Sequence, residues 1–157
     1  SKVSDTAEWP AALAAARAID AQGEVLVETY IPGREWTVGV LADEALPVVE
    51  IQAPQGWYGF QEKYTQGVTR YVFPQSEADR PLVASCQVLA LVAFKAVGCR
   101  GVSRVDFRVT PDGQPFVLEI NTVPGFTSTS LLPKAAAQAG ISFSALCARL
   151  LESAACG

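Results

Sequence analysis

The chain has 157 residues, half of them hydrophobic, and a formal net charge of −4 from twelve basic and sixteen acidic side chains. This length suits one domain, or one domain with part of another, and the composition can bury a core. The lack of a basic stripe argues against nucleic-acid and membrane-surface binding, and no apolar run is long enough to span a bilayer.

The first third of the chain alternates between apolar runs and turn signals. An alanine-rich stretch predicts a helix over Trp9–Asp20, with Pro10 in its first turn. Alternating apolar residues then predict three strands, at Val25–Tyr30, Glu35–Leu41 and Leu46–Ile51. Turns at Pro32-Gly33 and Asp43-Glu44 separate these strands.

The middle of the chain begins with an irregular stretch. Residues 54–67 hold glycines and aromatic residues without clean periodicity, which predicts a long loop of the functional kind. Arg70–Phe73 is typical of a short strand. Ser76 is then the predicted N-cap of a helix that extends to about Val97 and ends at Gly98.

The last third predicts a hairpin followed by two helices. Gly101–Thr110 and Gln114–Asn121 are the expected strands, and a polar loop follows over Thr122–Ser130. One helix then ends at Ala139, and Ser142 caps a final amphipathic helix. The whole order predicts an α+β fold with a mainly antiparallel sheet flanked by helices.

The hairpin gathers polar side chains on one face. Because strand residues alternate between faces, Arg104, Asp106 and Arg108 share one side of the first strand. Glu119 and Asn121 share one side of the second strand, together with Val117. The opposite face of the hairpin is apolar and is expected to meet the core.

The turn length decides whether these polar residues meet. A four-residue loop pairs Thr110 with Pro115, and it sets Asp106 opposite Glu119 and Arg104 opposite Asn121. The Pro-Asp-Gly sequence alone also fits a three-residue bulged turn, which pairs Thr110 with Gln114 and mixes the two faces. The four-residue register is predicted because it keeps the polar face intact.

Two directly opposed carboxylates destabilise a bare sheet, and a cation between them removes that repulsion. Two carboxylates and an amide oxygen are hard ligands that suit Mg²⁺. The alternative is an ordinary surface hairpin whose polar residues face water. The chain has no histidine, and its four cysteines lack zinc or redox spacing, so idle thiols in a reducing cytoplasm are expected.

Several ordered blocks resemble one protein family. Gly101–Asp106 (GVSRVD) and Leu118–Ser128 (LEINTVPGFTS) resemble the C-terminal signature of the D-alanine–D-alanine ligases, which are ATP-grasp carboxylate–amine ligases. Val27–Tyr30 with Gly33–Glu35, and Glu62–Thr65, resemble further family blocks in the same order. The resemblance covers nearly the whole chain.

The resemblance implies specific roles for the polar residues of the hairpin and the loop after it. Asp106, Glu119 and Asn121 look like ligands of Mg²⁺ (or Mn²⁺), and Arg104 looks like the residue that stabilises the transferring phosphoryl group. Gly125 would present its backbone N–H to an oxyanion, and Ser130 would hold the carboxylate of the second D-alanine. A helix N-cap is the alternative role for Ser130.

The resemblance also implies an ATP site. Its adenine-binding backbone would be Glu28, Thr29, Tyr30 and Ile31. Glu35 would bind the ribose hydroxyls, with an exposed strand residue as the alternative. Lys63 and Tyr64 resemble residues of a mobile loop that closes over the phosphates, with an ordinary surface lysine as the alternative for Lys63. Thr129 stands where the family often has histidine. Lys63-Tyr64 together with Leu131-Leu132 favours D-alanine as the second substrate.

The family resemblance implies a partial chain. Residues 1–27 would end the central ATP-grasp lid domain and residues 28–157 would form the C-terminal catalytic domain, with the N-terminal substrate domain absent. The whole protein is expected to be a cytoplasmic homodimer that joins two D-alanines with ATP for peptidoglycan synthesis. This chain alone is expected to be inactive. The alternatives are another ATP-grasp ligase, or a non-catalytic binding module.

Overall fold

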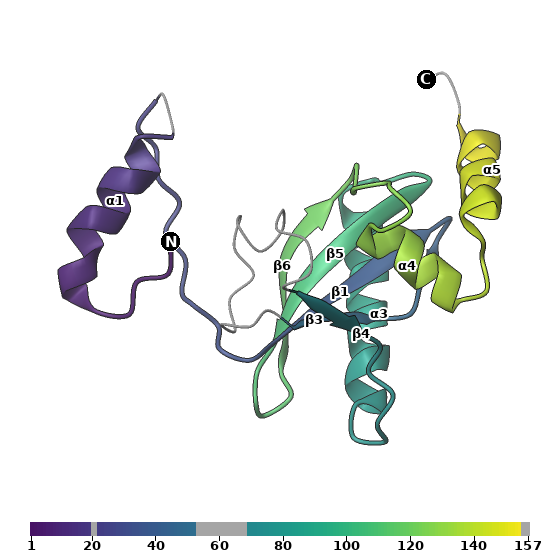
Figure 1. Cartoon of the computed structure of the whole chain (residues 1–157), viewed down its shortest axis with the longest axis horizontal. Coiled ribbons are helices and arrows are strands. Elements are labelled where there is room, and N and C mark those ends of the chain that lie inside the picture. The colour runs from purple at the N-terminus through teal and green to yellow at the C-terminus, as the bar shows by residue number, and fades with distance from the viewer. Residues whose placement is uncertain (20–21, 53–68, 155–157) are drawn as a thin grey trace. The chain divides into compact units, whose positions relative to one another are not determined.

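The structure is a computed structural model that describes residues 1–19, 22–52 and 69–154. The chain forms two compact units, Ser1–Ile31 and Pro32–Gly157. Figure 1 draws both units. The predicted loop at 54–67, with Lys63 and Tyr64, lies outside the described residues.

The first unit contains a short 3-10 helix at Thr6–Glu8 and α1 at Trp9–Arg17. Asp5 caps this start, because its carboxylate accepts from Ala7 N while the Glu8 side chain accepts from the backbone of Asp5. Pro10 lies in the first turn of α1, where its missing N–H costs nothing. The predicted helix is confirmed, although it ends at Arg17.

The strand predicted at Val25–Tyr30 is wrong. The described residues of the first unit form no strand, and Leu26 and Val27 are exposed. A strand needs a neighbour to satisfy its backbone N–H and C=O groups, and this unit offers none among its described residues.

The second unit is built on one antiparallel sheet with the order β4-β3-β1-β5-β6, and β2 pairs with β1 beside this path. Its strands are β1 (Arg34–Leu41), β2 (Glu44–Ala45), β3 (Val49–Gln52), β4 (Arg70–Val72), β5 (Val102–Val109) and β6 (Pro115–Asn121). Gly33 precedes β1 with a φ of 131°, and an added Cβ would lie only 2.0 Å from Val109 O. Glycine is therefore required where the chain enters the sheet.

The hairpin after β1 turns one residue earlier than predicted. Ala42 and Asp43 have φ values of 48° and 67°, which fit a two-residue hairpin turn. Glu44 therefore already pairs with Leu41, and the predicted strand at Leu46–Ile51 is observed only from Val49.

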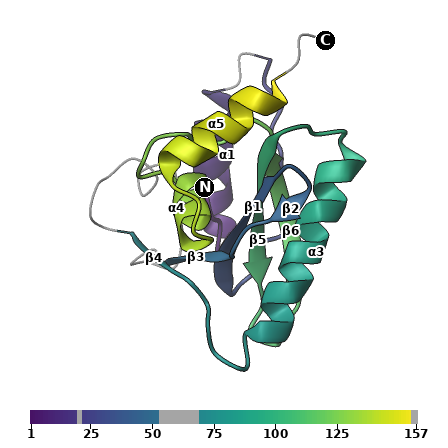
Figure 2. The same cartoon turned by 90° about the vertical axis from the view of Figure 1, so that its right-hand side faces the viewer.

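One face of the sheet packs against α3, Arg80–Ala96. Cys86, Ala90 and Phe94 recur every fourth residue and form the buried side of this helix. They share a core with Trp36 and Phe107 and other apolar residues of β1 and β5. Figure 2 shows α3 on one side of the sheet and α4 and α5 on the other.

The other face is covered in part by α4 (Leu131–Gln138) and α5 (Phe143–Ser153). Leu132, Ala135 and Leu146 pack there against Leu41 and Val49. Gly39 leaves room for this contact, since a Cβ at that position would lie 2.6 Å from Leu132 Cδ1. The two helices lie over one end of this face, and its other end carries polar side chains.

The β5–β6 hairpin combines both registers considered from the sequence. Thr110 N donates to Gln114 O at 3.0 Å around a three-residue turn, and Val109 pairs with Pro115, so the predicted Thr110–Pro115 pair is wrong. Leu118 is then an extra residue in β6, because Phe107 pairs with Val117 and Asp106 with Glu119. This bulge restores the predicted Asp106–Glu119 and Arg104–Asn121 pairs, which are confirmed.

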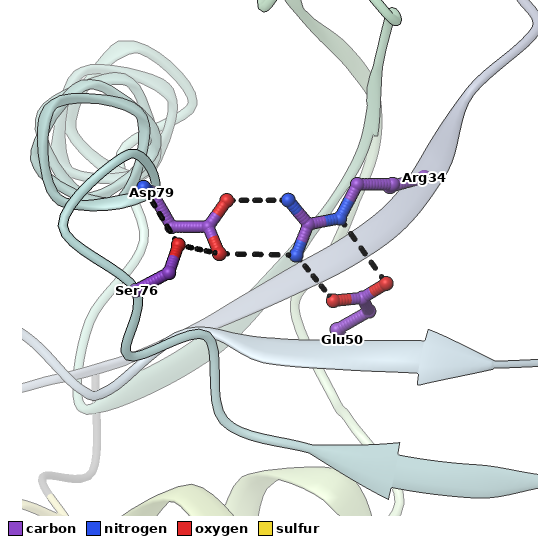
Figure 3. Close-up of polar contacts among 4 residues, drawn as sticks. All are labelled: Arg34, Glu50, Ser76 and Asp79. Atoms are coloured by element: carbon purple, nitrogen blue, oxygen red, sulfur yellow. Dashed lines mark hydrogen bonds and ion pairs between the residues drawn. The ribbon is translucent and has the colours of Figure 1, made fainter.

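Arg34 joins the start of α3 to the sheet, as Figure 3 shows. Its guanidinium donates to Glu50 of β3 through Nε at 3.2 Å and Nη2 at 2.6 Å, and it also pairs with Asp79. Ser76 was predicted as the N-cap, but Asp79 occupies that position, and its carboxylate bonds Arg34 and Ser76 rather than the helix backbone. An ion-pair bridge therefore sets the position of this helix end.

The described cysteines 86, 99 and 147 are free thiols, and burial raises the pKa of Cys86 to about 11. This keeps the Cys86 thiol protonated and unreactive at neutral pH. Within residues 1–19, 22–52 and 69–154, no helix has the length and apolar character needed to cross a membrane.

We predict that Asp79→Asn lowers the free energy of unfolding by about 1 kcal/mol, because it weakens the charged bridge to Arg34. The Arg34 hydrogen bond holds the pKa of Asp79 below its ordinary value. The stability that this bridge contributes is therefore fully present when the pH is above the ordinary pKa of an aspartate. It is lost as the pH falls through the lowered pKa of Asp79. Urea denaturation of both proteins from neutral to acidic pH should show the difference shrinking in acid.

Glu77→Gln is the matched control, because Glu77 and Arg80 form an exposed ion pair one turn apart at the same helix end. We expect no measurable change from it, since such surface pairs contribute little. A stability difference for Asp79→Asn that does not vary with pH would contradict the bridge.

Candidate metal and nucleotide site

The part of the sheet face not covered by α4 and α5 carries polar residues from three adjacent strands. The strand pairs Thr37–Asp106, Glu35–Arg108 and Asp106–Glu119 place these residues side by side, because directly opposed residues point to the same face. The set comprises Glu35, Thr37, Arg104, Asp106, Arg108, Glu119 and Asn121.

Asp106, Glu119 and Asn121 converge on one point. Asn121 Nδ2 lies 3.2 Å from Asp106 Oδ2 and 3.4 Å from Glu119 Oε1. The amide nitrogen thus bridges two carboxylates that face each other across the hairpin. This arrangement of groups is the one that the alternating pattern of the two strands predicted.

Asp106 is held from two further directions. Arg104 donates to both of its oxygens, with Nε 2.9 Å from Oδ1 and Nη2 2.8 Å from Oδ2. Thr37 Oγ1 lies 2.5 Å from Asp106 Oδ1. Asp106 is 8 % exposed, and these charge-assisted hydrogen bonds compensate for the burial of its carboxylate.

The donor set fits a hard divalent cation. One oxygen each of Asp106 and Glu119 already lies at the Asn121 amide. Rotating this amide by half a turn would put its oxygen where its nitrogen now lies, without moving any other group. Among the residues described, no cluster of three or more His, Cys, Asp or Glu side chains suits a metal. The third protein ligand here would therefore be the Asn121 amide oxygen, and Mg²⁺ commonly completes such a set with water and phosphate oxygens.

Glu35 lies beside a shallow cavity of about 220 Å³ at the start of β1, which Gly33, Ile51 and Gln52 also line. Its Oε2 accepts from Arg108 Nη1 at 3.1 Å, and the side chains of Glu35 and Arg108 are 16 % and 6 % exposed. The alternative of an ordinary exposed strand residue therefore does not describe Glu35. It is a partly buried carboxylate, held by an arginine in the wall of a cavity.

The loop before α4 brings Gly125 and Ser130 together. Ser130 Oγ accepts from Thr127 N at 3.0 Å and lies 2.8 Å from Thr127 Oγ1. Ser130 occupies the N-cap position of α4, yet it makes no side-chain capping bond there. An added Cβ on Gly125 would lie 3.3 Å from Ser130 Oγ. Glycine at this position therefore leaves room for the Ser130 hydroxyl. Lys134 Nζ also donates to Thr129 O and thereby closes the loop onto α4.

Two groups of predicted site residues belong to other parts of the chain. Glu28, Thr29, Tyr30 and Ile31 belong to the first unit, where Lys2 Nζ lies 4.0 Å from the Tyr30 ring centroid. Lys63 and Tyr64 lie outside the described residues. The adenine and loop assignments of these residues therefore stay predictions.

Sequence reasoning missed Thr37 as a partner of Asp106 and Arg108 as a partner of Glu35. The signal was present in β1, whose sequence REWTVGVL places Glu35 and Thr37 two residues apart on one face. What the sequence did not provide was the pairing of β1 with β5, because these strands lie about 70 residues apart.

Comparisons with known proteins agree on one family. The family model described as "D-ala D-ala ligase C-terminus" matches residues 1–152. A D-alanine–D-alanine ligase of Anaeromyxobacter sp. (strain Fw109-5) is 46% identical over 138 residues, which cover 85% of this chain and 43% of that protein. The chain thus spans less than half the length of the curated relatives that it matches.

Solved structures give the same result. The crystal structure of a D-alanine–D-alanine ligase from Bacillus anthracis complexed with ATP is similar with a TM-score of 0.78 and 33% identity, over 95% of this chain and 46% of that one. The VanG D-Ala:D-Ser ligase from Enterococcus faecalis has a TM-score of 0.78 and 36% identity, over 94% and 43%.

We predict that Glu35→Gln and Arg108→Met each lower the free energy of unfolding by about 2 kcal/mol, because either change removes one charge of a largely buried ion pair. The double variant should lose less than the sum of the two, with a coupling of about 1 kcal/mol or more. Urea denaturation of all four proteins gives the cycle. Arg70→Met, on an exposed residue of β4, is the control and should show no coupling with Glu35→Gln. Additive losses for Glu35 and Arg108 would show that the pair contributes nothing.

Proposed function

This chain belongs to the D-ala D-ala ligase C-terminus family, and on that premise we propose that it carries the metal and nucleotide site of an ATP-dependent ligase that joins two D-alanines. The observation that supports this most directly is the convergence of Asp106, Glu119 and Asn121 on one point of the sheet face. The matched family and the ATP complex of a similar ligase support the same assignment.

In the proposed reaction, the terminal phosphoryl group of ATP moves to the carboxylate of the first D-alanine, which yields ADP and an acyl phosphate. The amine of the second D-alanine attacks the acyl carbon, the carbon–oxygen bond to phosphate breaks, and the amine loses a proton. Converting the carboxylate to an acyl phosphate makes phosphate the leaving group. Bound Mg²⁺ (or Mn²⁺) would neutralise charge on the phosphates.

The residues of the sheet face have distinct tasks in this proposal. Asp106, Glu119 and Asn121 hold the cation. Arg104, whose guanidinium lies on the Asp106 carboxylate, places a fixed positive charge next to the transferring phosphoryl group. Glu35 accepts hydrogen bonds from the ribose hydroxyls at the cavity beside β1. Glu28 through Ile31 bind adenine, and Lys63 and Tyr64 close over the phosphates.

The loop before α4 would bind the amino-acid end of the reaction. Gly125 presents its backbone N–H to the oxyanion, and Ser130 binds the carboxylate of the second D-alanine. The Thr127 contacts support this role for Ser130, because they hold its hydroxyl outside the usual capping geometry. An anion at this position also lies at the start of a helix, where negative charge is favoured.

The proposal extends to the whole protein. We propose that the remaining half of the ligase supplies the first substrate site and further phosphate contacts, so that the 157-residue chain alone does not turn over. The whole protein would be a cytoplasmic homodimer acting in peptidoglycan synthesis, without nucleic-acid or membrane partners. Light scattering of the full-length protein tests the dimer.

We predict that Asp106→Asn and Glu119→Gln in the full-length protein lower kcat/KM at least about a hundredfold, because a cation contributes several kcal/mol to phosphoryl transfer. ADP release and mass spectrometry of the dipeptide, with ATP and D-alanine supplied, measure this. Asp112→Asn is the control, because it changes an exposed acid in the turn of the same hairpin and should keep full activity.

Three other results would change the proposal. If the wild-type protein forms product faster with D-serine or another amine than with D-alanine, that amine is the second substrate. Full activity of both Asp106→Asn and Glu119→Gln would show that the proposed metal site is wrong. A full-length protein that hydrolyses no ATP with any D-amino acid would support a non-catalytic binding module.

We also predict that Gly125→Ala raises the KM for the second D-alanine about tenfold while it leaves the KM for ATP nearly unchanged. The new Cβ would crowd Ser130 Oγ from 3.3 Å, and a small displacement of a substrate-binding group is costly. Steady-state kinetics with each substrate varied in turn measures the two constants. An equal rise in both constants would indicate a general disturbance rather than displacement of Ser130.

A further inference from the structure

Thr37 lies in the middle of β1, directly opposite Asp106 of β5. This residue is 2 % exposed, and its hydroxyl lies 2.5 Å from Asp106 Oδ1 and 3.3 Å from Val105 O. A hydroxyl has one proton to donate, and a charged oxygen at the shorter distance is the stronger acceptor. The Thr37 hydroxyl therefore donates to Asp106 Oδ1.

The two oxygens of Asp106 have different surroundings. Oδ1 accepts the hydrogen bond from the Thr37 hydroxyl and lies toward β1. Oδ2 lies 3.2 Å from Asn121 Nδ2, on the side of Glu119. Only Oδ2 therefore points into the group of three candidate ligands. A cation bound there would take one oxygen of Asp106 and not both.

We propose that Thr37 is the positioning residue that selects the cation-binding oxygen of Asp106, an inference that rests on the metal site of the proposed function. Arg104 cannot make this selection, because it contacts Oδ1 and Oδ2 at nearly equal distances of 2.9 and 2.8 Å. Arg104 fixes the plane of the carboxylate. Thr37 contacts one oxygen only and so distinguishes the two.

The position of Thr37 suits this task. Threonine is branched at Cβ and therefore stiff about χ1, and a strand in the centre of a sheet holds its backbone. The hydroxyl is thus placed by rigid elements, as groups that orient metal ligands commonly are. Thr37 and Arg104 come from different strands, so Thr37 holds Oδ1 independently of the Arg104 contact.

The test measures Mn²⁺ binding directly, by electron paramagnetic resonance of the full-length protein with ADP present. We expect Thr37→Val to weaken Mn²⁺ binding about tenfold, within the range typical when a partner of a metal ligand is removed. Thr37→Ser keeps the hydroxyl and should bind within about threefold of wild type. Thr37→Ala should bind as weakly as Thr37→Val, so the Ser and Ala pair isolates the oxygen if the valine variant does not fold.

Ser103→Ala is the matched control. Ser103 lies on the same sheet, is fully buried, and its hydroxyl has no hydrogen-bond partner among the described residues. Removing this hydroxyl should leave Mn²⁺ affinity unchanged. Thermal melts by circular dichroism of every variant separate loss of the fold from loss of the ion.

The outcomes separate the inference from the function that it rests on. If Asp106→Asn abolishes Mn²⁺ binding while Thr37→Val and Thr37→Ala bind as wild type, the role of Thr37 is overturned and the metal site stands. If Asp106→Asn and Glu119→Gln both bind Mn²⁺ as wild type, the metal site itself is wrong. Equal weakening by Thr37→Ser and Thr37→Ala would also overturn the inference, because the hydroxyl would then be irrelevant.

Discussion

One extra residue in β6 decides where the charges of this sheet meet. The turn after β5 closes in a register that would set Asp106 against Leu118, and the bulge at Leu118 shifts the pairing so that Asp106 faces Glu119. Two opposed carboxylates repel each other, and the structure counters this with the Asn121 amide between them and Arg104 behind one of them. A bulge beside a polar cluster is a common way to aim side chains at a site.

The two faces of the sheet have separate tasks. The face against α3 is an apolar core, and the Arg34 bridge to Glu50 and Asp79 holds the start of that helix to the sheet. On the opposite face, a second apolar cluster lies beneath α4 and α5. The remaining part of this face carries the polar residues of β1, β5 and β6, and β1 and β5 bury their other side against α3. Groups that must hold a cation to within tenths of an ångström are better placed on such strands than on loops.

The net charge of −4 does not prevent a site for an anionic nucleotide. Guanidinium groups lie within the acidic face itself: Arg104 on Asp106 and Arg108 on Glu35. Each pair is nearly buried, so it is less screened by salt than a surface pair. The negative charge of the phosphates would then be neutralised locally, by an arginine and by a cation that the carboxylates hold. The net charge of the whole chain matters little at such short range.

The sequence by itself determined the α+β class, the helices after the hairpin and the alternation that puts Glu119 and Asn121 on one side of their strand, because alternation and capping are local signals. It also identified the family, which the comparisons confirm. Only the tertiary structure decided that Val25–Tyr30 is not a strand, that β6 carries a bulge, and that Thr37 bonds Asp106. The bulge depends on how the two hairpin strands pair, and the Thr37 contact depends on pairing between strands about 70 residues apart, which leaves no periodic trace in either strand.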